Sequence, residues 1–219
     1  MIQLLAGYDF SNDRIDYQLN SQGYRCPEFE SINWNESVVV FGCSQTFGSH
    51  LRNSEHTVTH QLSLELNCPV INLGMGATSY TYQWINSTIL KSNGIVPKAV
   101  VYLWPEHSRQ TIFYSASTIA NHRAVGWWSL EPESDLTDIG LALVADKHHG
   151  TVMSHYQSEN VQTLWSVPVV QYSWAPPHPN KHIKVMNFPI DFAEDGLHPG
   201  FETNKLRASI IANDLRSIS

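Results

Sequence analysis

Short apolar runs that each end at a turn recur along this chain, and they constrain its fold more than any other feature. The clearest is Ser37–Phe41, a β-branched run that stops at Gly42. Runs of this kind are typical of strands buried on both faces of a parallel sheet. Four further runs share this character, the last two more weakly: Pro69–Leu73, Ala99–Leu103, Val167–Tyr172 and Ile183–Phe188. The sequence therefore predicts five strands.

Helical periodicity separates these runs. Between the first two, Val58, Leu62 and Leu66 recur at fourfold spacing, as one face of an amphipathic helix does. Two further helices are predicted, from Thr81, Trp84, Ile85, Ile89 and Leu90 and from Leu206, Ile210, Ile211, Leu215 and Ile218, the latter with Thr203 as its N-cap. Strands that alternate with helices predict an α/β domain with a mostly parallel sheet and helices on both sides.

The chain of 219 residues is long enough for one α/β domain, and we expect residues 1–219 to form a single one. Residues 1–36 are interpreted as a hairpin or a covering arm. The segment from about 105 to 166 is too long for a single crossover helix, so we expect a crossover that carries an insertion. That insertion either walls a ligand site or only extends the packing.

Composition and charge narrow the partners. Thirteen Lys and Arg against twenty Asp and Glu give a net charge of -7, without a basic run that would attract nucleic acid. No apolar stretch is long enough to span a membrane, and the start of the chain lacks the features of a signal peptide, so we expect a cytoplasmic protein. The three cysteines share no C-x-x-C spacing and indicate neither disulfides nor zinc. The oligomeric state stays open.

Polar residues that follow the strands are the candidates for chemistry, because ligands of open α/β sheets bind beyond the carboxyl ends of the strands. Ser44 follows the first strand between two glycines, which holds a hydroxyl at the edge of the sheet. Small residues in Asn72–Ser79 follow the second strand. Near the C-terminus, Asp195 stands three residues before His198, where a carboxylate can orient an imidazole that acts as a base.

Three blocks together resemble a known family. Gly42–Gly48, Asn72–Gly76 and Asp195–Pro199 are similar, in this order and at these distances, to the first, second and fifth sequence blocks of the SGNH (GDSL-type) hydrolases. Upstream, Asn20–Arg25 resembles the Asn-x-x-Gly-Phe-Arg segment that precedes the nucleophile in many members. The resemblance runs from about residue 17 to 215 and leaves the middle of the chain unmatched.

The resemblance implies a three-layer α/β/α, flavodoxin-like fold with a five-stranded, mostly parallel sheet. It also implies hydrolysis of a small acyl ester, often an acetyl group on a carbohydrate, through an acyl-enzyme on Ser44, with His198 as base and Asp195 as its orienting partner. The implied oxyanion donors are the backbone N–H groups of Ser44 and Gly76, with Gly74 as the alternative to Gly76. The expected partner is therefore a small-molecule or saccharide ester.

Two positions depart from the family pattern. Cys43 stands where an Asp usually precedes the nucleophile, which leaves a thiol nucleophile as an alternative to Ser44. After the third strand the family has Gly-x-Asn-Asp, whereas this chain has a segment whose possible site-lining residues are Trp104, Glu106, His107 and Arg109.

The missing Asn matters for the expected rate. Loss of one oxyanion donor typically costs about 100- to 1000-fold. His107 or Arg109 could replace it, whereas Glu106 would repel the oxyanion. The alternatives to an esterase are therefore a weak or inactive SGNH-like module that binds a glycan or a protein, and an O-acyltransferase that uses the same three residues.

Other groups of residues indicate a function less strongly. The scattered histidines His148, His149, His155, His178 and His182 are more simply surface residues than metal ligands, so neither a metal nor a cofactor is expected. Five tryptophans are either a sugar-stacking wall or core residues: Trp104, Trp127, Trp128, Trp165 and Trp174.

Overall fold

The computed structural model describes residues 2–5, 15–113, 122–125, 147–174, 180–186 and 189–218. Within these residues, parallel strands form a five-stranded sheet in the order β2-β1-β3-β6-β7. The strands are β1 (Val38–Gly42), β2 (Val70–Gly74), β3 (Ala99–Trp104), β6 (Val169–Ser173) and β7 (Lys184–Val185). All five predicted strands are confirmed, and this order is the flavodoxin-like one.

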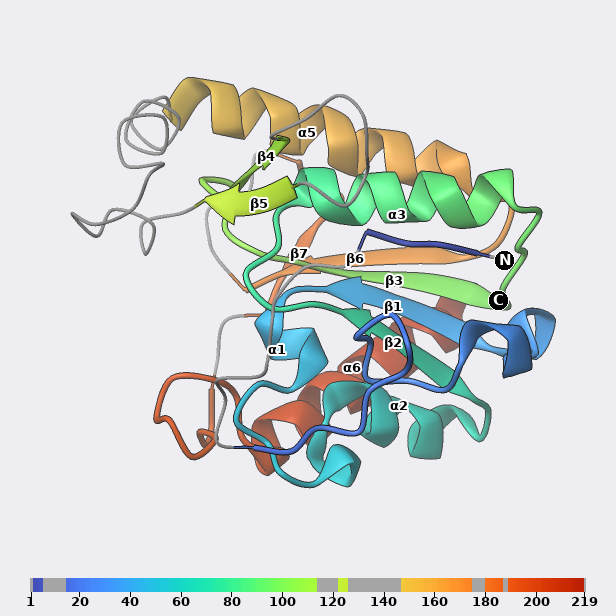
Figure 1. The fold of residues 1–219 in the computed structure, drawn as a ribbon, viewed down its shortest axis with the longest axis vertical. Helices are drawn as coiled ribbons and strands as arrows, with labels where there is room; N and C mark the ends of the chain where they lie inside the picture. Colours follow the sequence, from blue (N-terminus) through green and yellow to red (C-terminus); the bar gives the residue numbers. More distant parts are fainter. Residues whose placement is uncertain are drawn as a thin grey trace.

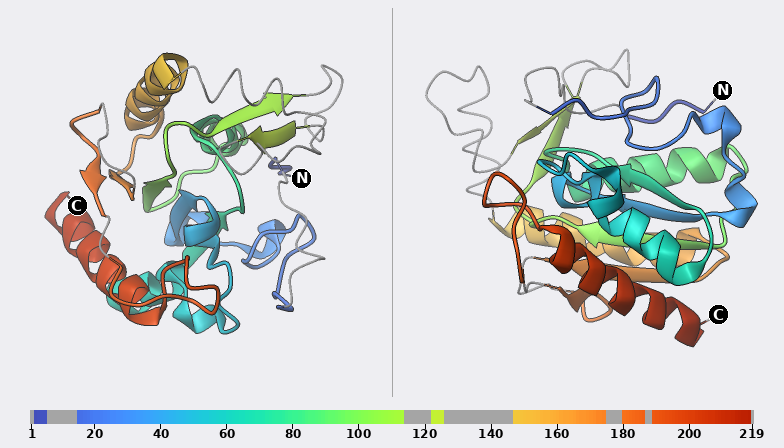
Figure 2. Two further views of the ribbon diagram at one scale, coloured as in Figure 1. Left: turned by 90° about the vertical axis from the view of Figure 1, so that its left-hand side faces the viewer. Right: turned by 90° about the horizontal axis from the view of Figure 1, so that it is seen from below.

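Helices cover both faces of the sheet (Figure 1). On one face lie α3 (Tyr80–Ser92) and α5 (Lys147–Leu164), and on the other α2 (Val58–Leu66) and α6 (Phe201–Ile218). The side views of Figure 2 show the same three layers. The predicted α/β/α architecture and the helices at α2, α3 and α6 are confirmed, whereas α5 had not been predicted as a helix.

The sheet separates two apolar clusters, because successive side chains of a strand point to opposite faces. Val39 and Phe41 of β1 pack towards α3 and α5, and Phe41 stacks on Tyr102 of β3 with ring centroids 5.1 Å apart. Val38 and Val40 pack towards α2 and α6. Every residue of β1 is buried, which explains why its sequence is apolar throughout and not alternating.

The remaining described segments are short. The N-terminal part contains the 3-10 helices η2 (Phe29–Ser31) and η3 (Trp34–Glu36), and η4 (Ser54–His56) precedes α2. Between β3 and α5, the antiparallel strands β4 (Gln110–Phe113) and β5 (His122–Val125) form a second sheet. Trp127 and Trp128 of the predicted aromatic wall lie outside the described residues. No helix in the described parts of the chain is long and apolar enough to cross a membrane.

The start of α6 differs from the prediction. The helix begins at Phe201, so Thr203 lies inside its first turn and is not the N-cap. The cap comes instead from Asp191, whose carboxylate accepts hydrogen bonds from the backbone N–H groups of Glu202 (3.0 Å) and Thr203 (2.7 Å). An acidic group at this end also interacts favourably with the positive end of the helix dipole.

Candidate active site

The turn that carries Ser44 is set by close packing at the carboxyl end of β1. The short helix α1 (Ser44–Phe47) folds back over the sheet, so a Cβ on Gly42 would lie 1.8 Å from Thr46 Oγ1. A Cβ on Gly74 of β2 would lie 2.4 Å from the backbone nitrogen of Phe47. Both glycines are therefore required for α1 to approach the strands, and this approach leaves Ser44 half-buried at the edge of the sheet.

His198 comes from a loop that closes on itself before α6 begins. Ala193 N donates to His198 O at 2.8 Å, and Gly200 N donates to Asp191 O at 3.0 Å. Within this loop, Oδ1 of Asp195 holds the turn, because it accepts from the backbone N–H groups of Leu197 (3.0 Å) and His198 (3.1 Å). In Figure 1 this loop and α1 lie at the same end of the molecule.

The structure brings Ser44, His198 and Asp195 together in one chain of hydrogen bonds. His198 Nε2 lies 2.9 Å from Ser44 Oγ, and His198 Nδ1 lies 2.5 Å from Asp195 Oδ2. A carboxylate only accepts, so Nδ1 carries the proton and Nε2 is left to accept from the Ser44 hydroxyl. The side chains of His198 and Asp195 are 23% and 14% exposed, so the carboxylate lies under the imidazole while the ring stays reachable.

The electrostatics keep Asp195 ionised. Partial burial alone would raise the pKa of Asp195, but the hydrogen bonds from the His198 ring and from the backbone N–H groups of His198 and Leu197 outweigh it and lower the pKa. A charged carboxylate at this position fixes the imidazole tautomer and stabilises the imidazolium that forms when the ring takes a proton.

The Ser44 N–H and the turn after β2 bear on the oxyanion donors that the resemblance implies. The Ser44 N–H is at the first position of α1, where a helix offers no acceptor. The turn after β2 is tied to β1, because Met75 N and Thr78 Oγ1 both donate to Gly42 O. None of the hydrogen bonds between described residues uses the Gly76 N–H.

The N–H of the alternative donor, Gly74, already makes a hydrogen bond within the protein. It donates to Asn72 Oδ1 at a distance of 2.9 Å. Ala77, directly after Gly76, has a left-handed backbone with φ of +53°. Such a conformation is uncommon for alanine and is often found at functional turns. Ser44 and Gly76 thus remain as the oxyanion donors that the sequence resemblance implies.

The segment after β3 contains the residues that were considered as possible site-lining residues, and the structure gives contacts for several of them. Trp104 is fully buried and stacks on Tyr80 with ring centroids 4.3 Å apart, because it lies on the same face of β3 as the core residue Tyr102. Glu106 Oε2 accepts from Arg109 Nε at 2.6 Å, so the two charges neutralise each other. His107 is half-buried.

Two other candidates have structural positions. Cys43 is 1% exposed and precedes α1 as its N-cap residue, and the atom that faces His198 is the oxygen of Ser44. Trp165 is also a core residue, whose Nε1 donates to Tyr102 Oη at 2.8 Å. Trp174 is half-buried beside the carboxyl end of β6.

Arg25 anchors the loop that follows Ser44, and its role was not evident from the sequence. This arginine is 8% exposed, and its guanidinium donates to the backbone carbonyls of Gly48 (2.9 Å) and Leu51 (2.8 Å). Because it is the last residue of Asn20–Arg25, its position explains how the upstream segment supports the nucleophile turn. Removing such a buried cation leaves several carbonyls without donors.

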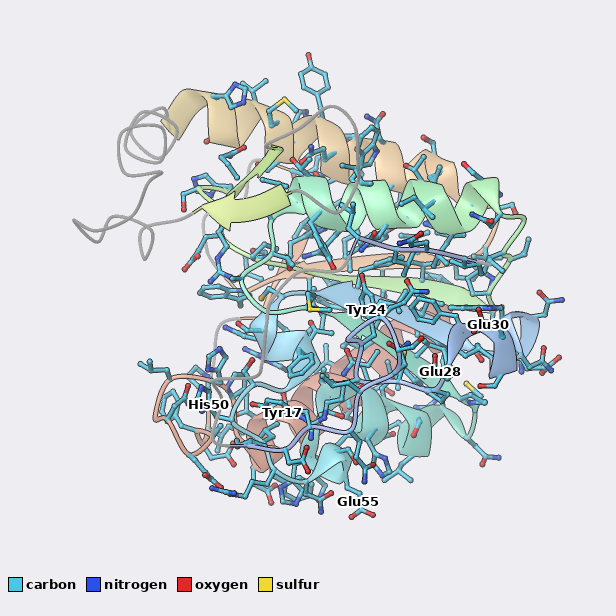
Figure 3. The ribbon with its side chains drawn as sticks, viewed as in Figure 1. Tyr17, Tyr24, Glu28, Glu30, His50 and Glu55 are labelled. Carbon is cyan, nitrogen blue, oxygen red and sulfur yellow. The ribbon has the colours of Figure 1, made fainter. Side chains whose placement is uncertain are left out.

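His50 is a further functional candidate that no sequence pattern had indicated. Its ring stacks on the ring of His198 with centroids 5.6 Å apart, and its Nε2 lies 3.6 Å from Asp195 Oδ2. Figure 3 shows it beside the loop that precedes α6. His50 has a left-handed backbone with φ of +62°, and its N–H donates to Tyr17 Oη at 2.9 Å.

In the described part of the chain, His50, Asp195 and His198 also form the group whose ligand atoms are close enough to hold a metal ion, all within 4.8 Å of one another. This group contains none of the histidines considered from the sequence as metal ligands, and His178 lies outside the described residues. A metal here would separate His198 from Asp195, so it would oppose the use of His198 as a base.

Comparisons with known proteins give matches only in structure. No family model matches the chain, and no curated protein sequence matches it. Among solved structures, it is similar to a carbohydrate esterase family 2 enzyme with a carbohydrate-binding domain from Corynascus thermopiles (Myceliophthora fergusii), at 9% identity and a TM-score of 0.48 over 83% of this chain. It is also similar to a family 2 carbohydrate esterase from Clostridium thermocellum in complex with cellohexaose, at 11% identity and a TM-score of 0.47 over 83% of this chain.

This chain spans 66% and 64% of the lengths of those two esterases. A third similar structure is a carbohydrate acetylesterase from Sinorhizobium meliloti, at 16% identity and a TM-score of 0.43, with 84% of this chain and 100% of the other covered.

Proposed function

We propose that this protein is a serine ester hydrolase of the SGNH class. The observation that carries the proposal is the chain of hydrogen bonds from Ser44 Oγ to His198 Nε2 at 2.9 Å and from His198 Nδ1 to Asp195 Oδ2 at 2.5 Å. A serine hydroxyl is a weak nucleophile until a neighbouring base takes its proton, and a carboxylate behind the base makes it effective.

The reaction proceeds in two halves. Ser44 Oγ attacks the ester carbonyl while His198 Nε2 takes the hydroxyl proton, and the carbonyl oxygen becomes an oxyanion facing the N–H groups of Ser44 and Gly76. Collapse of this intermediate expels the alcohol, which receives the proton from His198 and leaves an acyl-enzyme. Water, deprotonated by His198, then attacks the acyl carbonyl, and the acid is released as Ser44 regains its proton.

The substrate follows from the sequence resemblance. We propose a small acyl group, acetyl on a carbohydrate, as the ester that Ser44 cleaves. The Glu106–Arg109 pair at the position of the family Asn supports a slow enzyme, because the Glu106 carboxylate offsets the positive charge that Arg109 could offer to the oxyanion.

The same ion pair favours a second candidate, an inactive relative that binds a glycan in the same place. The two candidates differ in covalent chemistry. A fluorophosphonate probe forms a bond with Ser44 in the esterase, whereas the binding module retains glycan without labelling or turnover.

The experiment that tests the proposal compares Ser44→Ala with Ser54→Ala, an exposed serine in the following segment. We expect Ser44→Ala to abolish labelling and to lower kcat/KM for 4-nitrophenyl acetate by about 1000-fold or more, with unchanged thermal unfolding. Ser54→Ala should retain both. Equal labelling of the two variants, or the same rate of hydrolysis by both, contradicts the proposal.

A further inference from the structure

A small cavity lies directly beside the Ser44 turn, on the side of the sheet that α6 covers. Its walls include Gln45 of α1, Ser173 at the end of β6, Trp174 and Arg207 of α6, and its volume is about 20 Å³. That is room for one water molecule or for the end of a small polar group. Since Gln45 follows Ser44 in the chain, the cavity lies beside the turn that carries the proposed nucleophile.

Arg207 brings an unbalanced charge to this cavity. It is 6% exposed, and Nη1 donates to Gln45 Oε1 at 2.8 Å while Nη2 donates to Met186 O at 3.2 Å. Its Nε is buried without any acceptor. None of the ion pairs between described residues includes Arg207. Burial lowers the pKa of Arg207 to about 10, an effect that Cys43 partly opposes, so the guanidinium is still charged at neutral pH.

Trp174 adds a second donor without an acceptor. Its Nε1 is buried and makes no hydrogen bond. The ring of Trp174 lies under the guanidinium of Arg109, 5.4 Å from its centroid, but the charge of Arg109 is neutralised by Glu106. On the other side, Asp214 is paired with Lys184 at 2.7 Å. Of the described charges around the cavity, that of Arg207 is thus the one that lacks a counter-charge.

The missing partner must accept hydrogen bonds and carry negative charge. A water molecule would accept from one or both donors but would leave the guanidinium uncompensated. Phosphate and sulfate bring four oxygens, more than the two free N–H groups can bind. A carboxylate supplies two oxygens and one negative charge, which matches the two N–H groups and the single cation.

We propose that this cavity binds a carboxylate carried by the substrate, so that the protein prefers acidic esters to neutral ones. The inference rests on the proposed function, because an ester held at Ser44 is what brings such a carboxylate to the cavity beside it. The carboxylate belongs either to the acyl group, as in a succinyl ester, or to the alcohol, as in an acetylated uronic acid.

Hydrolysis of matched esters tests the preference and locates the carboxylate. One arm compares 4-nitrophenyl hydrogen succinate with 4-nitrophenyl butyrate, and the other compares acetylated glucuronate with acetylated glucose. In one arm we expect kcat/KM to be about 10- to 100-fold higher for the acidic ester, as for a buried charge-assisted hydrogen bond. Equal rates in both arms overturn the proposal.

Variants assign the preference to the two donors. Arg207→Met should remove it, and Trp174→Phe, which keeps the aromatic ring and loses only the N–H, should reduce it. Arg216→Met is the control: this arginine is on the same helix, is about half exposed and is far from the cavity in sequence. An acidic-to-neutral ratio that is the same in Arg207→Met, Trp174→Phe and Arg216→Met overturns the proposal.

Binding to an inactive variant separates this inference from the proposed function. Acetate is added to Ser44→Ala, and its binding is measured by calorimetry and by the rise in thermal unfolding temperature. We expect binding that is lost when Arg207→Met is added and retained when Arg216→Met is added. Unchanged binding after Arg207→Met, or none before it, overturns the cavity proposal. Acetate binding by a protein without esterase activity contradicts the proposed function and leaves the cavity proposal in place.

Discussion

Two segments that meet at the candidate site, 154 residues apart, are held by different forces. The turn after β1 is held by shape: Thr46 and Phe47 are fully buried, and α1 touches the backbone of β2. The loop before α6 is largely exposed, with Leu197 78% exposed, and it is held by hydrogen bonds to the carboxylates of Asp191 and Asp195. The Ser44 side therefore depends on packing, and the His198 side depends on charge.

This difference predicts distinct failures. A change of volume on the Ser44 side should unfold the protein, because buried backbone has no room to move. A loss of charge on the His198 side should leave the fold in place and remove the proposed chemistry, because an exposed loop relaxes into water. The exposed Arg52–Glu194 ion pair that joins the two sides, with an N–O distance of 2.7 Å, contributes little to either.

The largest expected effect is that of Asp195→Asn. The amide cannot fix the imidazole tautomer or stabilise the imidazolium, so kcat for 4-nitrophenyl acetate should fall by about 1000- to 10000-fold. Thermal unfolding should change little. Glu194→Gln, an exposed carboxylate in the same loop, is the matched control and should keep its rate. A fall of less than tenfold in Asp195→Asn would show that the carboxylate does not act on His198.

Gly74→Ala should have the next largest effect, and it acts on the fold. The added Cβ would lie 2.4 Å from the backbone nitrogen of Phe47 and 2.7 Å from Thr46 Cβ, and we expect a loss of about 3 kcal/mol in the free energy of unfolding. Gly94→Ala meets no atom within 4 Å but has φ of +75°, so it should cost only about 1 kcal/mol. Urea denaturation measures both, and equal losses would mean that the β2–α1 approach is not tight.

The sequence could predict much of this arrangement because its signals are local. Apolar runs place the strands, and the order of strands brings the ends of β1 and β2 to one edge. The burial of Trp104 was also within reach, since it shares the parity of the core residue Tyr102 along β3. What the sequence could not give depends on contacts between distant residues. Asn72 Nδ2 donates to the backbone carbonyl of Thr46, 26 residues away, and Asp191 caps α6 from ten residues upstream.

His50 shows the same limit on the site itself. A histidine in a left-handed conformation has no sequence signature, and its approach to Asp195 depends on how the loop after α1 folds. The tie from Arg25 to Gly48 and Leu51 is likewise a contact between segments more than twenty residues apart. A side chain that donates to backbone carbonyls places no requirement on the residue types that carry them, so the supported segment shows no pattern for the contact.

A smaller effect, on stability, is expected from Asp191→Ala. Partial burial alone raises the pKa of Asp191, but hydrogen bonds from Thr203 and the Glu202 N–H outweigh it and lower the pKa. A carboxyl with a lowered folded pKa stabilises the protein above its unfolded value of about 3.9, and this contribution is lost as the pH falls through the folded value. Asp191→Ala should cost about 1 kcal/mol at neutral pH.

The pH dependence distinguishes a cap from a simple packing contact. The difference in unfolding free energy between wild type and Asp191→Ala should shrink as the pH falls below about 4, where Asp191 of the unfolded chain becomes protonated, and disappear below the lowered folded pKa. Asp191→Asn, which can still accept hydrogen bonds but has no charge, should fall between the two at neutral pH. A difference that stays constant from neutral to acidic pH would mean that the charge of Asp191 contributes nothing.

The smallest effect is expected from His50→Asn, and this variant tests whether the His198 side can bind a metal ion. Asparagine tolerates the left-handed backbone of residue 50, so the substitution removes the imidazole with little strain. Hydrolysis should change only a few-fold, because His50 lies 3.6 Å from Asp195 and makes no hydrogen bond to Ser44.

In the wild type, zinc should inhibit by binding His50, Asp195 and His198 together, and EDTA should restore the rate. In His50→Asn the zinc concentration for half inhibition should rise about tenfold. His56→Asn, a nearby histidine outside this group, should be inhibited like the wild type. If His50→Asn is inhibited as strongly as the wild type, the three side chains do not bind zinc together, and the stacked position of His50 on His198 has another cause.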